Sequence, residues 1–387
     1  MAFVQSFPKP KSGVTRLMGL FGKKRNANDE RNADIQRAVE AIHDPNNDQT
    51  LAESGAVERV ECGDKSCQID IVLDYPPGDW EAELTSRIRE AVASVDASLE
   101  PAVTVAFVAP EGSAMHGKPL PGVKNIIAVA SGKGGVGKSS TSINLALALA
   151  ADGAKVGLLD ADIYGPSQPR MLGSNEKPRQ VDDKSMAPVE AHGLQTMSIG
   201  YLVDEESAMV WRGPMVTSAL MQLLNDTRWD GLDYLIVDMP PGTGDVQLTL
   251  AQKVPVAGSV IVTTPQEIAT LDARKAINMF NKVNVPILGV IENMATHVCS
   301  NCGHVEAIFG EGGGDAIARQ YGTELLGRLP LDLRIREDLD AGTPTVAKDP
   351  AGALAGTYRQ AARRLAAGLG RAVRSQEQTG PEIVIEE

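Results

Sequence analysis

Residues 125–153 restrict what this chain can fold into more than any other segment. They begin with the apolar run NIIAVAS, continue with GKGGVGKS and end with STSINLALALAADG. The pattern G-x-x-x-x-G-K-[ST] is matched by Gly132, Gly137, Lys138 and Ser139, and its neighbours predict a strand before it and a helix after it. Such a loop binds phosphates through its backbone N–H groups and the positive end of the helix. We therefore expect a nucleotide site in which Lys138 contacts the β- and γ-phosphates and Ser139 ligates Mg²⁺.

Four further apolar runs follow the same scheme. Short apolar segments bounded by turn residues recur at 155–162, 233–240, 258–264 and 286–294, and helical patterns separate most of them. Fully apolar strands that alternate with helices are typical of a parallel sheet covered on both faces. With 43% hydrophobic residues and few aromatic ones, the chain can bury an aliphatic core of this kind. The predicted fold class is α/β, with a mostly parallel sheet flanked by helices.

The length of 387 residues favours two domains, one of them large. In the first part of the chain, the patterns predict two amphipathic helices, ADIQRAVEAIHD and WEAELTSRIREAVASV, a hairpin that turns at Gly63-Asp64, and a final strand, PAVTVAFVA. These elements form a small α+β unit. The expected organisation is a basic flexible tail (1–29), a small α+β domain (30–109), a linker rich in Pro and Gly (110–122), the phosphate-loop domain (123–373) and an acidic tail (374–387).

Two of the four cysteines, Cys62 and Cys67, flank the turn of this hairpin. They are interpreted as ordinary strand residues or as part of a metal site, and both interpretations stay open. A framework of disulfides is not expected, because so few cysteines in a chain of this length indicate a reducing compartment. The N-terminus also lacks the apolar run of a secretory leader. We therefore expect a cytoplasmic protein.

The formal net charge of −13 argues against non-specific binding to nucleic acid. No apolar stretch approaches the roughly 18 residues that a membrane span needs. Residues 1–25, however, carry six basic residues and no acidic one. They are interpreted as a solvated extension or as a basic amphipathic turn that makes weak contact with a membrane surface or a partner.

A second lysine, Lys133, follows the first glycine of the phosphate loop. This variant, GKGGVGK, resembles the loop of the dimeric ATPases related to MinD, ParA and the nitrogenase iron protein. In those relatives the extra lysine reaches across a nucleotide-sandwich dimer to the partner's phosphates. The resemblance implies a homodimer that binds ATP, in which both Lys133 and Lys138 are catalytic.

Three aspartates stand at the ends of predicted strands. Asp160 and Asp162 belong to LLDADIYGPS, and Asp238 belongs to LIVDMPPGTGD. Ligands of open α/β sheets bind at this end of the strands, although a single aspartate there also serves as a helix cap or turn former. By family resemblance, Asp162 orients the attacking water, Asp160 lies nearer the Mg²⁺ shell and Asp238 holds Mg²⁺ through water. The loop PPGTGD is then able to sense the γ-phosphate.

The stretch HVCSNCGH holds Cys299 and Cys302 two residues apart, which is half of a metal or cluster site. Together with GKGGVGKSS, DADIYGPS, MPPGTGD, ENM and IFGEGGG, it resembles the Mrp (ApbC) family of iron–sulfur cluster carriers over most of residues 30–370. The small N-terminal domain is similar to the MIP18 (DUF59) domain that many members carry. The nucleotide-binding residues are then expected to be Gly132, Lys133, Gly134, Gly135, Val136, Gly137, Lys138, Ser139, Ser140 and Asn293, the last reading the adenine base.

The resemblance also implies where the other half of the cysteine site lies. A four-cysteine cluster needs four thiolates, so Cys299 and Cys302 of two copies would hold one [4Fe–4S] cluster at the dimer interface and pass it to apo iron–sulfur client proteins. The family's pair is often C-P-x-C, whereas here Ser300 follows the first cysteine. Structural Zn²⁺, a redox pair and two buried cysteines remain alternatives.

A second function class is a spatial organiser that cycles on a membrane or nucleoid, as related ATPases do, with the cysteines binding structural zinc. Such a protein needs a surface anchor. The last helical pattern, GALAGTYRQAARRLAAGLGRAV, is expected to pack in the core, since the acidic segment PEIVIEE follows it. Residues 1–25 are the better candidate for an anchor.

Overall fold

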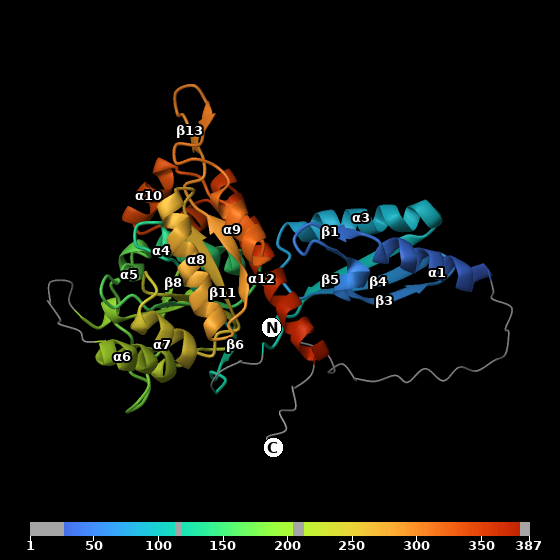
Figure 1. Cartoon of the computed structure of the whole chain (residues 1–387). Coiled ribbons are helices and arrows are strands. Elements are labelled where there is room, and N and C mark those ends of the chain that lie inside the picture. Colours follow the sequence, from blue (N-terminus) through green and yellow to red (C-terminus); the bar gives the residue numbers. More distant parts are fainter. Residues whose placement is uncertain (1–26, 113–117, 204–212, 380–387) are drawn as a thin grey trace, which may run out of the picture.

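The computed structural model describes residues 27–112, 118–203 and 213–379. They form a small N-terminal domain and a larger domain built on one extended sheet, with the last helix, α12 (Ala353–Thr379), lying where the two meet (Figure 1). The basic segment 1–25 and the acidic residues 380–387 lie outside the described residues. Helix α12 itself runs to Thr379, into the segment expected as an acidic tail.

The N-terminal domain is α+β. Its three-stranded sheet has the order β3-β4-β5, in which β3 and β4 are antiparallel and β4 and β5 are parallel. Along β4, every second side chain is buried, including Ile69, Ile71 and Leu73, and helices α1 and α3 pack beside the sheet. Both predicted helices, the hairpin and the last strand are confirmed. The elements are α1 (Ala27–Glu40), β1 (His43–Asp44), β2 (Gln49–Thr50), α2 (Leu51–Ser54), β3 (Val57–Cys62), β4 (Ser66–Leu73), α3 (Trp80–Val95) and β5 (Glu100–Phe107).

A disulfide joins Cys62 to Cys67 across this hairpin. The two residues are directly opposite in the β3–β4 register, a position where cross-strand side chains approach closely. The placement of both cysteines in facing strands is confirmed, whereas a metal role for the pair is wrong, because their sulfur atoms are bonded to each other. The two cysteines are five positions apart, so the disulfide closes one short hairpin and is not part of a larger framework.

The large sheet has eight strands in the order β15-β12-β11-β6-β10-β7-β9-β8, and every pair except β8–β9 is parallel. The five predicted strands are confirmed as β6, β7, β10, β11 and β12, whereas the sequence patterns missed the other three. The α/β fold class is thereby confirmed. The strands are β6 (Val123–Ala130), β7 (Val156–Asp160), β8 (Val189–Ala191), β9 (Leu194–Ser198), β10 (Leu232–Asp238), β11 (Gly258–Thr263), β12 (Ile287–Glu292) and β15 (Leu325–Arg328).

Helices cover both faces of this sheet, and the side chains of each strand alternate between two cores. On β6, for example, Ile127 and Val129 join the core shared with α4, α12 and the N-terminal domain, while Ile126 and Ala128 join the core under α6, α7 and α8. The helices are α4 (Lys138–Ala151), α5 (Gln168–Met171), η1 (Ile199–Tyr201), α6 (Gly213–Asp226), α7 (Asp245–Lys253), α8 (Glu267–Lys282), α9 (Gly313–Tyr321), α10 (Leu333–Asp340), α11 (Thr345–Lys348) and α12.

Helix α12 is a core helix, as predicted. Tyr358, Leu365 and Leu369 are buried, and the helix packs on α4, β12 and β15. Its arginines face the N-terminal domain and the end of α4. Arg359 and Arg363 both pair with Asp152, which caps α4, and with Asp79 of the N-terminal domain. The carboxyl end of the helix that follows the phosphate loop is thus tied to the N-terminal domain.

A short hairpin of β13 (His297–Val298) and β14 (Val305–Glu306) projects from the large domain at the top of Figure 1. It follows β12 and carries the cysteine pair in its turn. Among the described residues, no helix combines the length and the apolar character needed to cross a membrane.

Candidate functional site

The phosphate loop lies between the carboxyl end of β6 and the first residue of α4, Lys138. Gly137 adopts a left-handed conformation with a φ of 80°, and a Cβ there would collide with the side chain of Asn293. A Cβ at Gly132 would collide with the backbone of Asp272 in α8. Since only glycine tolerates such positions, both glycines are needed for the loop to lie this close to its neighbours.

A cavity of about 260 Å³ opens above this loop. It brings together most of the residues that the sequence singled out, while Val136 is buried beneath the loop. Pro241 of the predicted PPGTGD loop also lines it, and so does Met171, which belongs to none of the sequence motifs. The lining residues are Ser131, Lys133, Gly134, Gly135, Gly137, Lys138, Ser139, Ser140, Asp162, Ser167, Met171 and Pro241.

Lys138 forms a buried ion pair at the floor of this cavity. Its Nζ donates to Oδ1 of Asp238 at 2.6 Å, and the two side chains are only 6% and 0% exposed. The same oxygen accepts a hydrogen bond from Oγ of Ser142 at 2.8 Å, and Nζ also lies 3.2 Å from Oγ of Ser139. A phosphate bound at the loop would therefore compete with Asp238 for Lys138.

Asp160 is the partner of Asp238 in the register of β7 and β10, so two buried carboxyl groups end adjacent strands. Burial, together with the nearby charge of Asp238, raises the pKa of Asp160 to about 7. Four donors converge on it: the backbone N–H groups of Asp162, Ser167 and Gln168, and Oγ of Ser198. Asp160 thus fixes the loop that follows β7.

Asp162 lines the cavity, and burial raises the pKa of its carboxyl group. The PPGTGD loop approaches from the other side, where the N–H of Gly242 donates to the carbonyl of Ser131 at 3.0 Å. The hydroxyl oxygen of Ser139 and the carboxylate oxygens of Asp160 and Asp238 are the kind of ligand that Mg²⁺ prefers. The assigned roles of these residues remain predictions.

Asn293 lies behind the loop, outside the lining of the cavity. Its Nδ2 donates to the carbonyl of Val136 at 2.8 Å, and its backbone N–H donates to Thr263. In the structure it supports the loop, and its reading of an adenine base stays a prediction. The neighbouring Glu292 is buried and accepts a hydrogen bond from the N–H of Gly314, which ties the IFGEGGG segment to the sheet.

Gln168 is the site residue that sequence reasoning missed. It is 1% exposed, and its side-chain amide donates both to the carbonyl of Ser139 and to Oδ2 of Asp238, each at 3.1 Å. The motif DADIYGPS ends at Ser167, one residue before it. The sequence could have indicated Gln168 only as a polar residue that directly follows this loop.

The cysteine pair lies in the turn of the projecting hairpin, apart from the phosphate loop in sequence. Cys299 is half-buried and Cys302 is exposed. The turn is closed by the N–H of Cys299, which donates to His304, and by the N–H of Gly303, which donates to Cys299. Hydrogen bonds from the backbone of Asn301 and then of Cys302 lower the pKa of the Cys299 thiol, which favours the thiolate that metals bind.

One chain supplies an incomplete metal site. Within the described ranges, no group of three or more His, Cys, Asp or Glu side chains could hold a metal ion. His297 of β13 uses Nδ1 to contact the carbonyl of Leu331 at 3.1 Å, which fixes its ring. Three apolar side chains on or just after this hairpin are about half exposed: Val298, Val305 and Ile308.

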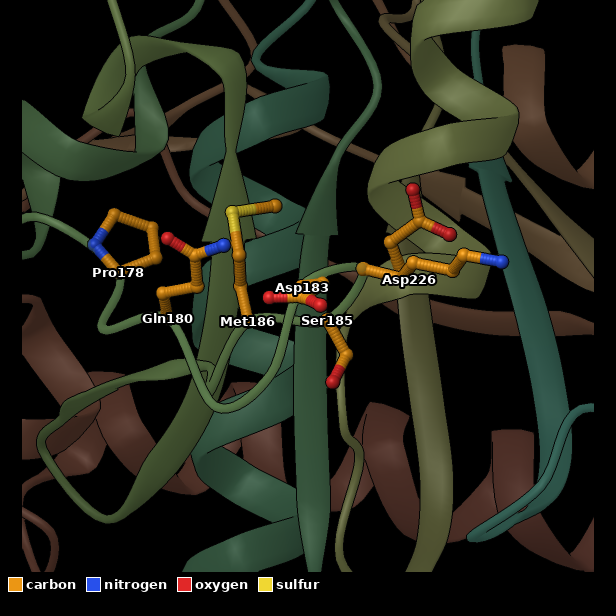
Figure 2. Close-up of a pocket in the computed structure, with 7 residues that line it drawn as sticks. Pro178, Gln180, Asp183, Ser185, Met186 and Asp226 are labelled. Atoms are coloured by element: carbon orange, nitrogen blue, oxygen red, sulfur yellow. The ribbon is translucent and has the colours of Figure 1, made fainter.

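A larger hollow of about 550 Å³ lies elsewhere, and six of its residues are labelled in Figure 2. It borders the turn in which the backbone N–H groups of Lys184 and Ser185 donate to Asp182. Its lining mixes Asp183 and Asp226 with Lys184 and offers no glycine-rich loop for phosphates. We therefore assign nucleotide binding to the smaller cavity.

Comparisons with known proteins show the family of both domains. Residues 122–366 match the family described as NUBPL iron-transfer P-loop NTPase, and residues 32–105 match the iron–sulfur cluster assembly protein family. The iron–sulfur cluster carrier protein of Haemophilus influenzae is 49% identical over 337 residues, which cover 87% of this chain and 91% of that protein. The protein of the same name from Escherichia coli K12 is 64% identical over 249 residues, 64% of this chain and 68% of that protein.

A solved structure, the nucleotide-binding protein of Archaeoglobus fulgidus in complex with ADP, is 39% identical with a TM-score of 0.51. The match covers 57% of this chain and 87% of that one. The predicted resemblance to iron–sulfur cluster carriers is confirmed by these matches across both domains. The chain therefore belongs to the family of NUBPL iron-transfer P-loop NTPases, and it carries an N-terminal iron–sulfur cluster assembly domain.

Proposed function

We propose that this protein is an ATP-hydrolysing carrier that holds a [4Fe–4S] cluster between two copies of the chain and transfers it to apo iron–sulfur proteins. The observation that carries the proposal is the pair of free cysteines, Cys299 and Cys302, on a hairpin that projects from a P-loop NTPase domain. The names of the relatives support the cargo, and the phosphate loop supports the nucleotide.

The cysteines support a site shared by two chains. A cluster of this type takes four thiolates, and each chain offers two at this hairpin. In a symmetric homodimer, Cys299 and Cys302 would meet their copies. The half-exposed Val298, Val305 and Ile308 on or just after the hairpin would lose contact with water in such a pairing, which favours association. Because the cluster needs free thiolates, we propose that the protein works in the reducing cytoplasm, where the local Cys62–Cys67 disulfide would be open to reduction.

ATP is proposed to act as a switch and not as a reagent for chemistry on the cargo. Phosphate binding would draw Lys138 from Asp238 and so disturb the two loops that border the cavity, one with Asp162 and the other with PPGTGD. Mg²⁺, when bound, would neutralise phosphate charge beside Ser139, Asp160 and Asp238. Asp162 would orient the attacking water, and Lys133 would reach the phosphates of the partner subunit.

The decisive test is anaerobic reconstitution with iron and sulfide, followed by an absorption spectrum and an iron count. We expect about one four-iron cluster per two chains, or roughly two irons per chain. Cys299→Ala and Cys302→Ala should each lose nearly all iron, because each removes two of the four thiolates from a symmetric site. ATP hydrolysis, which depends on other loops, should persist in part.

The matched controls are Cys62→Ala and Cys67→Ala, which break the disulfide of the β3–β4 hairpin, leave the β13–β14 hairpin unchanged and should not alter the iron content. Iron that survives in the Cys299 variant contradicts the proposal. Bound Zn²⁺ with no visible absorption after reconstitution favours a structural site instead, and with it the alternative function of a spatial organiser related to MinD and ParA.

A further inference from the structure

Gln168, the first residue of α5, connects three parts of the nucleotide site. Its Nε2 is 3.1 Å from the carbonyl oxygen of Ser139 and 3.1 Å from Oδ2 of Asp238. Its backbone N–H donates to Oδ2 of Asp160, also at 3.1 Å. Gln168 therefore links Ser139 and the end of β10 through its side chain, and the end of β7 through its backbone.

The chemistry of its partners fixes the orientation of the Gln168 amide. Both groups near Nε2 are acceptors, a carbonyl oxygen and a carboxylate oxygen, so only the NH₂ end can face them. Oε1 must then point the other way. Among the residues that the structure describes, this buried oxygen has no hydrogen-bond partner.

The carboxylate of Asp238 divides its bonds between a charged donor and neutral ones. Oδ1 accepts from Lys138 and Ser142, and Oδ2 accepts from Gln168. If Lys138 moves to a phosphate, Asp238 loses its only charged partner among these three. Ser142 and Gln168 are then the groups left to hold the carboxylate in its rotamer.

We propose that Gln168 is a positioning residue that holds Asp238 in place once Lys138 has moved to a nucleotide phosphate. Asp238 then keeps its negative charge directed at the cation that accompanies the phosphates. The unpartnered Oε1 of Gln168 is suited to accept a hydrogen bond from a buried water, since a buried acceptor without a donor is unfavourable. The proposal rests on Mg²⁺-nucleotide binding at this site and is independent of the iron–sulfur cargo.

The test measures binding of a fluorescent ADP analogue to the full-length protein, in EDTA and across a Mg²⁺ titration. Gln168→Met preserves the length of the side chain but has no amide. It should bind the analogue in EDTA within about twofold of the wild type, because a thioether of similar size leaves the cavity in shape. The Mg²⁺ concentration for half-maximal tightening should rise about tenfold, the usual effect of losing a hydrogen bond to a charged group.

Two controls separate positioning from a general structural effect. Gln195→Met makes the same chemical change in β9, where the side chain pairs with the backbone of Asp230, and should leave both measurements unchanged. In an Asp238→Asn background, adding Gln168→Met should have no further effect on the Mg²⁺ titration, since Gln168 acts through Asp238.

Several results would overturn the proposal. If Gln168→Met lowers the affinity for the ADP analogue equally in EDTA and in Mg²⁺, Gln168 only maintains the shape of the pocket. If the Mg²⁺ titration is unchanged, Gln168 does not position Asp238. If Gln168→Met does not fold, Gln168→Asn replaces it, since the shorter amide cannot reach both the carbonyl of Ser139 and Oδ2 of Asp238. The Mg²⁺ concentration for half-maximal tightening should rise in the same way, and an unchanged value refutes the proposal. A wild-type protein that binds no nucleotide would instead refute the proposed ATPase itself.

Discussion

Replacing Lys138 by alanine tests whether the buried pair with Asp238 is as important for the fold as the geometry indicates. At 2.6 Å and an effective dielectric constant near 20, the attraction between the two charges is about 6 kcal/mol before desolvation is subtracted. Removing one partner leaves Asp238 buried and charged, which in other proteins costs about 3–5 kcal/mol. Lys138→Ala should therefore lose several kcal/mol of stability in addition to abolishing ATP hydrolysis. Without nucleotide and with EDTA, the thermal midpoint at pH 7.5 should drop by roughly 10 °C.

The double variant Lys138→Ala/Asp238→Asn supplies the refuting result. Asparagine carries no charge, and its oxygen can accept from Gln168 while its NH₂ group donates to the hydroxyl of Ser142. The double variant should therefore unfold at a higher temperature than Lys138→Ala alone at pH 7.5. If the single variant is as stable as the double variant, or is within about 0.5 kcal/mol of the wild type, the carboxylate is not an uncompensated buried charge. The reasoning on this pair would then be wrong.

Three further outcomes are expected. Lys133→Ala should bind an ADP analogue within about threefold of the wild type yet lose turnover, since its proposed contact lies across the dimer; loss of binding measured by fluorescence would contradict this. Because burial and Asp238 raise the pKa of Asp160 to about 7 from an ordinary 3.8, the native state binds one more proton than the unfolded state between these values. Stability in EDTA should thus fall by up to about 1.4 kcal/mol per pH unit as pH rises through this window, and Asp160→Asn should flatten the slope measured by urea unfolding. Asp152→Ala should lower the thermal midpoint far more than Asp79→Ala, because Asp152 has a 0% exposed side chain between Arg359 and Arg363 whereas Asp79 is 65% exposed.

The parts of the fold that could be predicted from the sequence depend on short-range patterns. The phosphate loop needs glycines at fixed offsets, and each of the five predicted strands is a run of apolar residues that the sheet buries on both faces. Strands β8, β9 and β15 have three to five residues and include charged or polar residues such as Gln195 and Arg328. They are strands because neighbouring strands offer them hydrogen bonds, which no local pattern records.

The cysteines show the same limit. Cys299 and Cys302 are separated by two residues in one turn, so their spacing alone predicts half of a metal or cluster site. Cys62 and Cys67 were placed on opposite sides of a hairpin, but whether they would pair depended on the register of β3 and β4, which sets them directly opposite. A shift of one residue would have turned one of them to the other face of the sheet.

At the floor of the nucleotide site, sequence motifs identify the charged residues more easily than the polar residues that form hydrogen bonds with them. Lys138 and Asp238 are 100 residues apart in the chain, and each was found because its residue type has a known use beside phosphate or Mg²⁺. Gln168 and Ser142 have no such signature, although Asp238 accepts a hydrogen bond from each of them. Any side chain of the right length that carries a hydrogen-bond donor could bind Asp238 in this way. The requirement therefore fixes the position of the donor atom and not the type of residue. Such positions become visible only when the strands that carry the charges are brought side by side.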